Sequence, residues 1–292
     1  MKSTPRQVGL LLRTYATKAE DAPRRLALVA ETLAQVAKAQ VNGIPFFTRV
    51  DVLVWTDKRF QDRDCGLTAA LLRKELPAAQ DGIPVTIHEV DHGDIFCGIL
   101  NYGVAMQMAH GITHSLVMSP DAASYLTPDA VADFSAAIDA GARAAGLATH
   151  ELADSVMQGR FTNTFSLWET SALLTVGGFD LIAAKPADDR VGTFLRSWSL
   201  TEEETTYALA GVEEIIPLIR LVDVYGPCIA PIRLRTDAPQ QYVVPDAATQ
   251  PELFRRHTMK MEKKMQRQAA MAASAGADLD YLKGGILPAY RV

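Results

Sequence analysis

The stretch LVMSPDAASYLTPDAV, Leu116 to Val131, determines how the rest of the chain is interpreted. Its apolar run ends abruptly at Ser119-Pro120-Asp121, and a short polar segment leads to Pro128-Asp129. A short apolar run that ends in turn residues is typical of a buried strand, and proline followed by an acid is typical of a helix start. The stretch therefore predicts a strand that ends on a carboxylate, then a loop and a helix.

The same alternation runs through the first half of the chain. Short apolar runs predict strands at Val8–Tyr15, Arg49–Asp57, Ile83–Val90 and Thr113–Met118. Helical spacing predicts one helix that begins near Asp21 and stops at Asn42-Gly43, and others at Gly66–Leu76, Ile95–His110 and Pro128–Ala145. Strands that alternate with helices indicate an α/β fold with a mostly parallel central sheet flanked by helices.

The second half of the chain is less regular. The stretch Ser155–Asp180 predicts a strand or loop and then a short helix closed by Gly177-Gly178. A helix is expected near Glu213–Val224, a strand in CIAPIRL (Cys228–Leu234), and a basic helix rich in Met and Ala from Pro251. We place a soft boundary near Thr236, which gives a main domain over residues 1–235 and a C-terminal extension over residues 236–292.

Composition limits the classes of protein that this chain can belong to. A net charge of -5 argues against broad binding of nucleic acid, which needs a basic surface. Three cysteines are an odd number, so a complete disulfide framework is not expected, and a reducing, cytoplasmic setting fits best. No apolar stretch approaches the length of a membrane span.

The carboxyl ends of the predicted parallel strands are where a ligand is expected, because in open α/β sheets ligands bind beyond those ends. These ends carry Arg13-Thr14-Tyr15, Trp55-Thr56-Asp57, Asp91-His92 and Ser119-Pro120-Asp121. Asp121 therefore lies on the predicted ligand-binding rim.

Several motifs follow one another in a defined order. Asp57 ends the second strand, NYGVAMQMAHG contains Asn101, Gly103 and Gly111, and Ser119-Pro120-Asp121 ends the fourth strand. WETSALLTVGGFD (Trp168–Asp180) and VEEIIPLIRLVDVYG (Val212–Gly226) come next. In this order and spacing the chain resembles the GT-A glycosyltransferases, and within them the large family 2 group, over roughly residues 6–232.

The resemblance implies a GT-A fold and a glycosyltransferase that moves a sugar from a nucleotide-sugar donor to a hydroxyl of a small molecule or glycan. Inversion and a Mg²⁺ or Mn²⁺ ion are implied with it. The residues expected at the donor are Thr14, Tyr15, Asp57, Asn101 and Gly103; at the acceptor Trp168, Glu169 and Asp180; as general base Glu214 beside Glu213; and at the metal Asp121 and His257.

The chain departs from the family pattern at three places. Ser119 stands where the family has the first Asp of its Asp-x-Asp metal motif. Gln107, Met108 and Ala109 replace a frequent Ala-Arg-Asn, so a familiar polar contact is expected to be missing. The usual Glu-Asp pair is Glu213-Glu214.

Each assignment has a structural alternative. Asp121 can cap the turn after its strand, and Glu213 and Glu214 can stabilise a helix start. Asp57 can pair with Lys58 or Arg59 in solvent, and Trp168 can be a core residue. The segment around His257 can be a solvated helix face, and contact of this helix with a membrane surface is a weaker interpretation. For the whole protein, the alternatives are a nucleotidyltransferase-like enzyme and a non-catalytic binding or scaffold protein.

Overall fold

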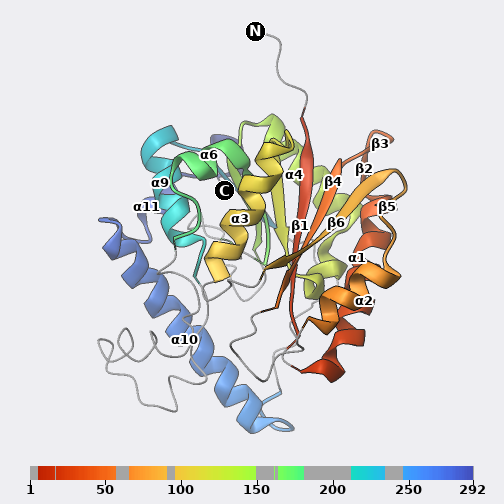
Figure 1. Ribbon diagram of the computed structural model, residues 1–292. Coiled ribbons are helices and arrows are strands. Elements are labelled where there is room, and N and C mark those ends of the chain that lie inside the picture. Colours follow the sequence, from red (N-terminus) through yellow and green to blue (C-terminus); the bar gives the residue numbers. More distant parts are fainter. Residues whose placement is uncertain are drawn as a thin grey trace.

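The computed structural model describes residues 6–16, 18–56, 66–90, 96–148, 161, 164–180, 212–233 and 246–291. Its centre is an eight-stranded sheet with the order β10-β8-β9-β7-β1-β4-β6-β5, between two layers of helices (Figure 1). The strands are β1 (Val8–Thr14), β4 (Arg49–Trp55), β5 (Ala79–Gln80), β6 (Ile83–Val90), β7 (His114–Met118), β8 (Ala144–Ala148), β9 (Phe165–Glu169) and β10 (Ile229–Arg233). Only β5 and β9 run antiparallel to their neighbours, which confirms the predicted α/β fold with a mostly parallel sheet flanked by helices.

The helices divide between the two faces of the sheet. One face is covered by α1 (Ala22–Lys38), α2 (Leu67–Glu75) and α4 (Pro128–Asp139). The other is covered by α3 (Phe96–Ala109), α6 (Thr170–Thr175), α9 (Ile215–Tyr225), α10 (Pro251–Ser274) and α11 (Tyr281–Gly284). Along β1 the side chains alternate, so Leu10 and Leu12 join the first core and Leu11 joins the second. Burial on both faces explains why the central strands read as continuous apolar runs.

One expected helix ends earlier than its sequence suggests. The alanine-rich segment Pro128–Ala145 was predicted to be helical throughout, but α4 ends at Asp139 and β8 begins at Ala144. Gly141 has a φ of 85°, a left-handed conformation that stops the helix. Small residues then suit a central strand, because a Cβ atom on Gly146 would lie 2.2 Å from the ring of Phe161.

Asn42-Gly43 has a different role from the predicted one. Helix α1 already ends at Lys38, and Asn42 and Gly43, with φ of 53° and 77°, form the turn between β2 (Gln40–Val41) and β3 (Ile44–Pro45). Two consecutive residues with positive φ are typical of a tight hairpin turn. The prediction that this pair stops the helix was therefore wrong.

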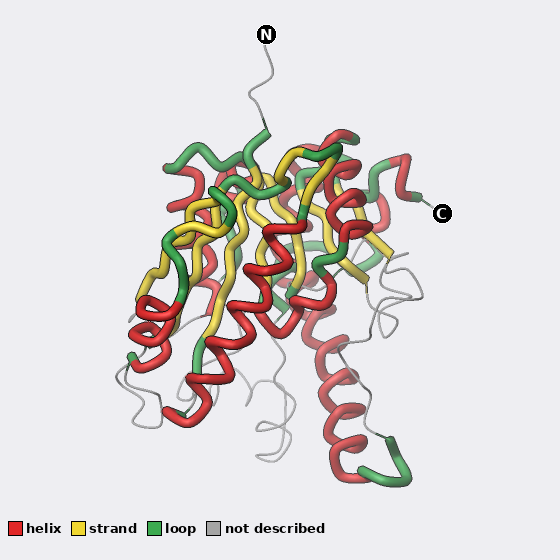
Figure 2. The backbone as a smooth tube through the Cα atoms, turned by 90° about the vertical axis from the view of Figure 1, so that its right-hand side faces the viewer, coloured by secondary structure: helices red, strands yellow, loops and turns green. Residues whose placement is uncertain are grey.

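The C-terminal part of the chain packs into the second core. Met271 and Ala272 of α10 and Leu282 of α11 are buried together with α9. Ile286 forms a parallel bridge with Ile229 at the outer edge of β10. The N-terminal turns of α10 extend below the sheet in Figure 1 and in the rotated view of Figure 2. No helix in the described ranges is long and apolar enough to cross a membrane.

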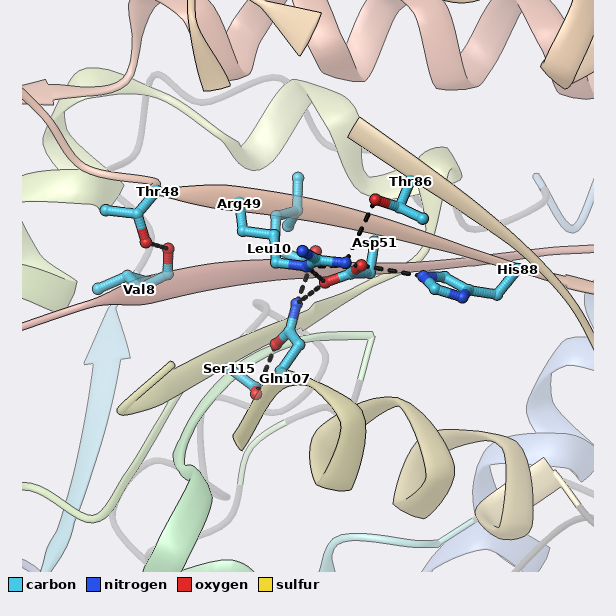
Figure 3. A network of polar contacts seen from close by, with 9 residues as sticks. All are labelled: Val8, Leu10, Thr48, Arg49, Asp51, Thr86, His88, Gln107 and Ser115. Carbon is cyan, nitrogen blue, oxygen red and sulfur yellow. Dashed lines mark hydrogen bonds and ion pairs between the residues drawn. The ribbon is translucent and has the colours of Figure 1, made fainter. Parts of the chain in front are cut away.

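A buried polar network ties the sheet to α3 (Figure 3). Asp51 of β4 is fully buried and accepts two hydrogen bonds from Nε of Arg49, at 2.9 and 2.8 Å, and one from Nε2 of Gln107, at 3.0 Å. His88 Nε2 lies 3.0 Å from the same carboxylate, and Ser115 Oγ donates to Gln107 Oε1 at 2.7 Å. Gln107 therefore makes buried polar contacts of its own in this network, while the loss of the family's familiar contact at this position stays a prediction.

Candidate functional site

The carboxyl ends of β1, β4, β6 and β7 meet at one edge of the sheet, because these four strands are parallel. The end of β1 places side chains on both sides of this edge. Side chains point alternately to the two faces of a strand. Arg13 therefore lies, like Leu11, on the face covered by α9 and α10, and Thr14 lies, like Leu12, on the face covered by α1. Two groups of polar residues gather there, one on each side of β1.

The first group surrounds Asp121, which lies in the short 3₁₀ helix Pro120–Tyr125 after β7. Its Oδ2 atom accepts hydrogen bonds from Arg25 Nη1 at 2.9 Å and from Ser119 Oγ at 3.0 Å. The side chain is 47% exposed. Asp121 is thus neither sealed in the core nor turned fully into solvent, and Arg25, which the sequence did not single out, holds it.

Aromatic residues extend this group. The guanidinium of Arg25, from the first turn of α1, lies 5.7 Å from the ring centroid of Tyr15. Tyr15 meets Trp55, at the end of β4, edge to face at 5.7 Å. Thr14 is buried, and its Oγ1 atom has no hydrogen-bond partner among the described residues. A buried hydroxyl without a partner costs free energy, and the predicted contact of Thr14 with a donor stays a prediction.

A divalent cation at this edge would depend on Asp121. Within the described part of the chain, no three His, Cys, Asp or Glu side chains are grouped to hold a metal ion. A single carboxylate still fits Mg²⁺, which usually takes one or two protein carboxylates and completes its shell with phosphate and water. Asp57 lies outside the described residues, as does the side chain of His257.

The second group is an acid pair that immediately precedes α9. Glu213 is 7% exposed and Glu214 is 1% exposed. Gln268 Nε2 of α10 donates a hydrogen bond to Glu214 Oε1 at 3.1 Å. Arg267, the neighbour of Gln268, is also buried. Charged groups this deep in a protein are normally paired, and here α10 supplies the partners.

Burial and the neighbouring acid set the ionisation of Glu213. Burial raises the pKa of Glu213 to about 7, and the charge of Glu214 acts in the same direction, against the smaller effects of Arg13 and Lys264. Burial lowers the pKa of Arg267, while the charges of Glu213 and Glu214 oppose that effect. A carboxylate that titrates near neutral pH is suited to accept and release protons.

Asp180 belongs near the acid pair. The negative charges of Glu213, Asp180 and Glu214 all act on the buried thiol of Cys97, at the start of α3, whose pKa burial raises. Asp180 Oδ2 also accepts a hydrogen bond from Arg220 Nη2 of α9 at 2.9 Å. The structure therefore brings together three of the acids that the sequence assigned to catalysis and to the acceptor.

The other two acceptor-side residues lie elsewhere. Trp168 is fully buried, between the rings of Phe161 and Phe179 at 5.6 and 5.1 Å. Because β9 is antiparallel, Glu169 is paired with His114 at the amino end of β7, the opposite edge from Asp121. Glu169 forms an ion pair with Arg143 there. The structure does not bring these two residues to the carboxyl edge.

Asn101 and Gly103 have clear packing contacts in α3. Asn101 Nδ2 donates to the carbonyl oxygen of Phe179 at 2.8 Å, and its Oδ1 accepts from the amide of Phe179 at 2.7 Å. A Cβ atom on Gly103 would lie 2.6 Å from Leu11 and 2.8 Å from Leu53. Their proposed contact with a nucleotide stays a prediction.

Sequence reasoning missed Arg25, Arg267 and Gln268. Arg25 carried no signal beyond its place in the helix after the first strand. Arg267 and Gln268 did carry one, because they precede Met271 and Ala272 by one helical turn and so share their buried face.

No protein-family model matches this chain, and no curated protein matches its sequence. Among solved structures, it is similar to the mannosyltransferase PcManGT from Pyrobaculum calidifontis in complex with GDP-Man and Mn²⁺. The two chains are 13% identical, the TM-score is 0.40, and the match covers 94% of this chain and 77% of the other.

Proposed function

We propose that this protein is a glycosyltransferase that moves a sugar from a nucleotide-sugar donor to an acceptor hydroxyl with inversion. The observation that carries the proposal is the buried pair Glu213 and Glu214, on the same side of the sheet as the end of β1, with Glu213 titrating near neutral pH. The order of the sequence motifs supports it, as does the position of Asp121 at the edge where α/β proteins bind ligands.

The acid pair would provide the base for the reaction. A carboxylate of the pair accepts the proton of the acceptor hydroxyl as the oxygen attacks the anomeric carbon of the donor. The bond between that carbon and the phosphate oxygen breaks, and its electron pair leaves with the nucleoside diphosphate. One attack from the face opposite the leaving group inverts the anomeric centre.

The group around Asp121 would bind the donor. Tyr15 and Trp55 offer aromatic faces and Thr14 a hydroxyl, while Arg25 offers a cation for the diphosphate. Asp121 would hold Mg²⁺ or Mn²⁺, which would offset the charge that builds up on the leaving phosphate. Arg25 forms an ion pair with Asp121 in the structure, so the metal ion and the guanidinium of Arg25 would both interact with this one carboxylate.

The test is a thermal-shift series with UDP, GDP, UDP-glucose and GDP-mannose, each with and without Mn²⁺. A ligand at about 100 times its Kd adds about 2.7 kcal/mol to the free energy of unfolding, so a bound donor raises Tm. Mn²⁺ should increase the shift, and Asp121→Asn should remove that increase. Glu75→Gln, which changes an exposed acid of α2, is the matched control.

Activity completes the test. A transferase releases UDP or GDP from the sugar nucleotide when an acceptor is present, and loss of the base should lower kcat by about 10²–10⁴-fold. If no nucleotide changes Tm, the protein is a non-catalytic relative. If it instead consumes a nucleoside triphosphate and releases pyrophosphate, it is a nucleotidyltransferase.

A further inference from the structure

The face of α10 that meets α9 is polar at one end and apolar at the other. Lys264, Arg267, Gln268, Met271 and Ala272 occupy positions i, i+3, i+4, i+7 and i+8, which places them on one side of the helix. Met271 and Ala272 are buried in the second core, and Arg267 and Gln268 are as deeply buried one turn earlier. The buried face of α10 thus delivers two polar side chains to the acid pair.

The burial of these side chains needs a compensating interaction. Ordering a long polar side chain costs rotamer freedom, and removing it from water costs more. The amide of Gln268 recovers this through its 3.1 Å hydrogen bond to Glu214, and the guanidinium of Arg267 does so through the charges of Glu213 and Glu214.

The contacts of the two acids differ. Glu214 is sealed from solvent and accepts the hydrogen bond from Gln268, which fixes the orientation of its carboxyl group. Glu213 is the more exposed of the two and has a hydrogen bond to its own backbone. Burial raises the pKa of Glu213 to about 7, so Glu213 is the acid of the pair that takes up a proton.

We propose that Gln268 and Arg267 are positioning residues that divide the roles within the acid pair, with Glu214 held in place by Gln268 and Glu213 accepting the proton of the acceptor. This inference rests on the proposed glycosyl transfer and reverses the roles that the sequence suggested. It makes the C-terminal helix part of the catalytic apparatus. The other charged or titratable groups that face the pair are Arg13 of β1, Cys97 of α3 and Lys264 of α10.

The pH profile of kcat/KM for UDP or GDP release assigns the base. Glu213→Gln should lower kcat by about 10²–10⁴-fold and abolish the acid limb of the profile. Glu214→Gln should lower kcat less than Glu213→Gln does, by about as much as Gln268→Met, and its acid limb should move to lower pH, because Glu213 then ionises without a negative neighbour. If the two variants exchange these behaviours, Glu214 is the base and the proposal is overturned.

The role of α10 is tested with Gln268→Met, and Gln266→Met on the exposed face of the same helix is the matched control. Gln268→Met should lower kcat by about tenfold or more with KM unchanged, as expected for the loss of one hydrogen bond to a charged group. In the Glu214→Gln background the same change should have no further effect.

Arg267→Met should move the acid limb of the pH profile to higher pH, and Arg267→Lys should largely restore the wild-type profile.

A readout that does not need activity separates this inference from the proposed function. The carboxyl carbons of ¹³C-labelled glutamate are followed by NMR as the pH is changed. Gln268→Met should shift the titration of Glu214, and Gln266→Met should leave both acids unchanged. Gln268→Asn, which keeps the amide but withdraws it, is used if the first variant does not fold. If Gln268→Met leaves the titration of Glu214 unchanged, the role of Gln268 is overturned, even if sugar transfer is confirmed. If the titration shifts but the protein does not transfer sugar, only the proposed glycosyltransferase function is overturned.

Discussion

At the scale of single residues, the ionised state of Asp51 depends on its neighbours. Burial alone would raise the pKa of this carboxyl group, but hydrogen bonds from His88, Arg49 and Gln107 outweigh burial and lower it. Gly9 leaves room for the arrangement, since a Cβ atom there would lie 2.7 Å from Nε2 of Gln107. A negative charge can therefore be held in the middle of the sheet because its hydrogen bonds are satisfied.

Asp51→Asn should destabilise the protein strongly, because it leaves Arg49 partly buried without its counter-charge. Removing one partner of a buried pair costs about 3–5 kcal/mol, which urea unfolding measures at pH 7. The lowered pKa means that the contribution is present above about pH 4 and is lost as the pH falls through the folded-state value. Glu89→Gln, which breaks the exposed pair with Arg73, should cost less than about 1 kcal/mol. Equal losses in the two variants would contradict this account.

The effect of Glu213 on the pH dependence of the free energy of unfolding should be opposite in sign to that of Asp51. Its pKa is raised from 4.5 to about 7, so the folded protein binds the proton more tightly than the unfolded chain does. Stability is then highest below about pH 4.5 and falls as the pH rises toward 7, by about 3 kcal/mol at most. Glu213→Gln should remove this slope and be more stable than the wild type at pH 8. A pH-independent difference between the two proteins would show that burial does not perturb this acid.

At the scale of elements, the contact of α3 with the sheet depends on one glycine. Gly103→Ala places a methyl group within 2.8 Å of Leu11 and Leu53, and overpacking of this kind costs about 1–3 kcal/mol. Gly98→Ala lies on the same helix with no atom within 4 Å, so it should be neutral or should stabilise the helix by about 0.5–1 kcal/mol. Thermal unfolding of the two variants compares them directly, and similar Tm changes would contradict close packing at Gly103.

The elements also show what can be predicted from a sequence. The ends of β1, β4, β6 and β7 lie within two residues of their expected positions, because strands buried on both faces read as apolar runs bounded by polar residues. Strand β8 was missed because Ala144 and Ala145 have high helix propensity, whereas the pairing with β9 and β10 that makes this segment a strand involves residues distant in the sequence. Asn42-Gly43 was misread because such a pair can end a helix or form a hairpin turn.

The sequence predicted where the candidate site lies better than it predicted which residues contact one another there. The edge that holds Thr14, Tyr15 and Asp121 follows from the parallel strands alone. The partners Arg25 and Gln268 do not, because they are distant in the sequence from the acids that they contact. The roles of all these residues in binding and catalysis stay predictions.

At the scale of the whole molecule, the C-terminal segment is expected to be required for folding. Met271, Leu282, Ile286 and Leu287 are buried, and each contributes about 1.5–3 kcal/mol, against a total stability of about 5–15 kcal/mol for a typical domain. A chain that ends at residue 250 should therefore lose its cooperative thermal transition, measured by circular dichroism. Leu253→Ser, at an exposed position of α10, should leave Tm unchanged. A shortened chain that melts like the intact one would show that the segment is a separate appendage.

The bridge between Ile229 and Ile286 has a consequence for synthesis of the protein. The amide of Ile229 donates to the carbonyl oxygen of Gly285, and the amide of Leu287 donates to that of Ile229, both at 2.9 Å. The outer side of β10 thus gains these partners only after residues 285–287 have left the ribosome. Until then a nascent polypeptide presents an open strand edge, the kind of surface through which chains aggregate. Chaperones that shield such edges would act on this protein in the interval between the synthesis of β10 and that of Gly285.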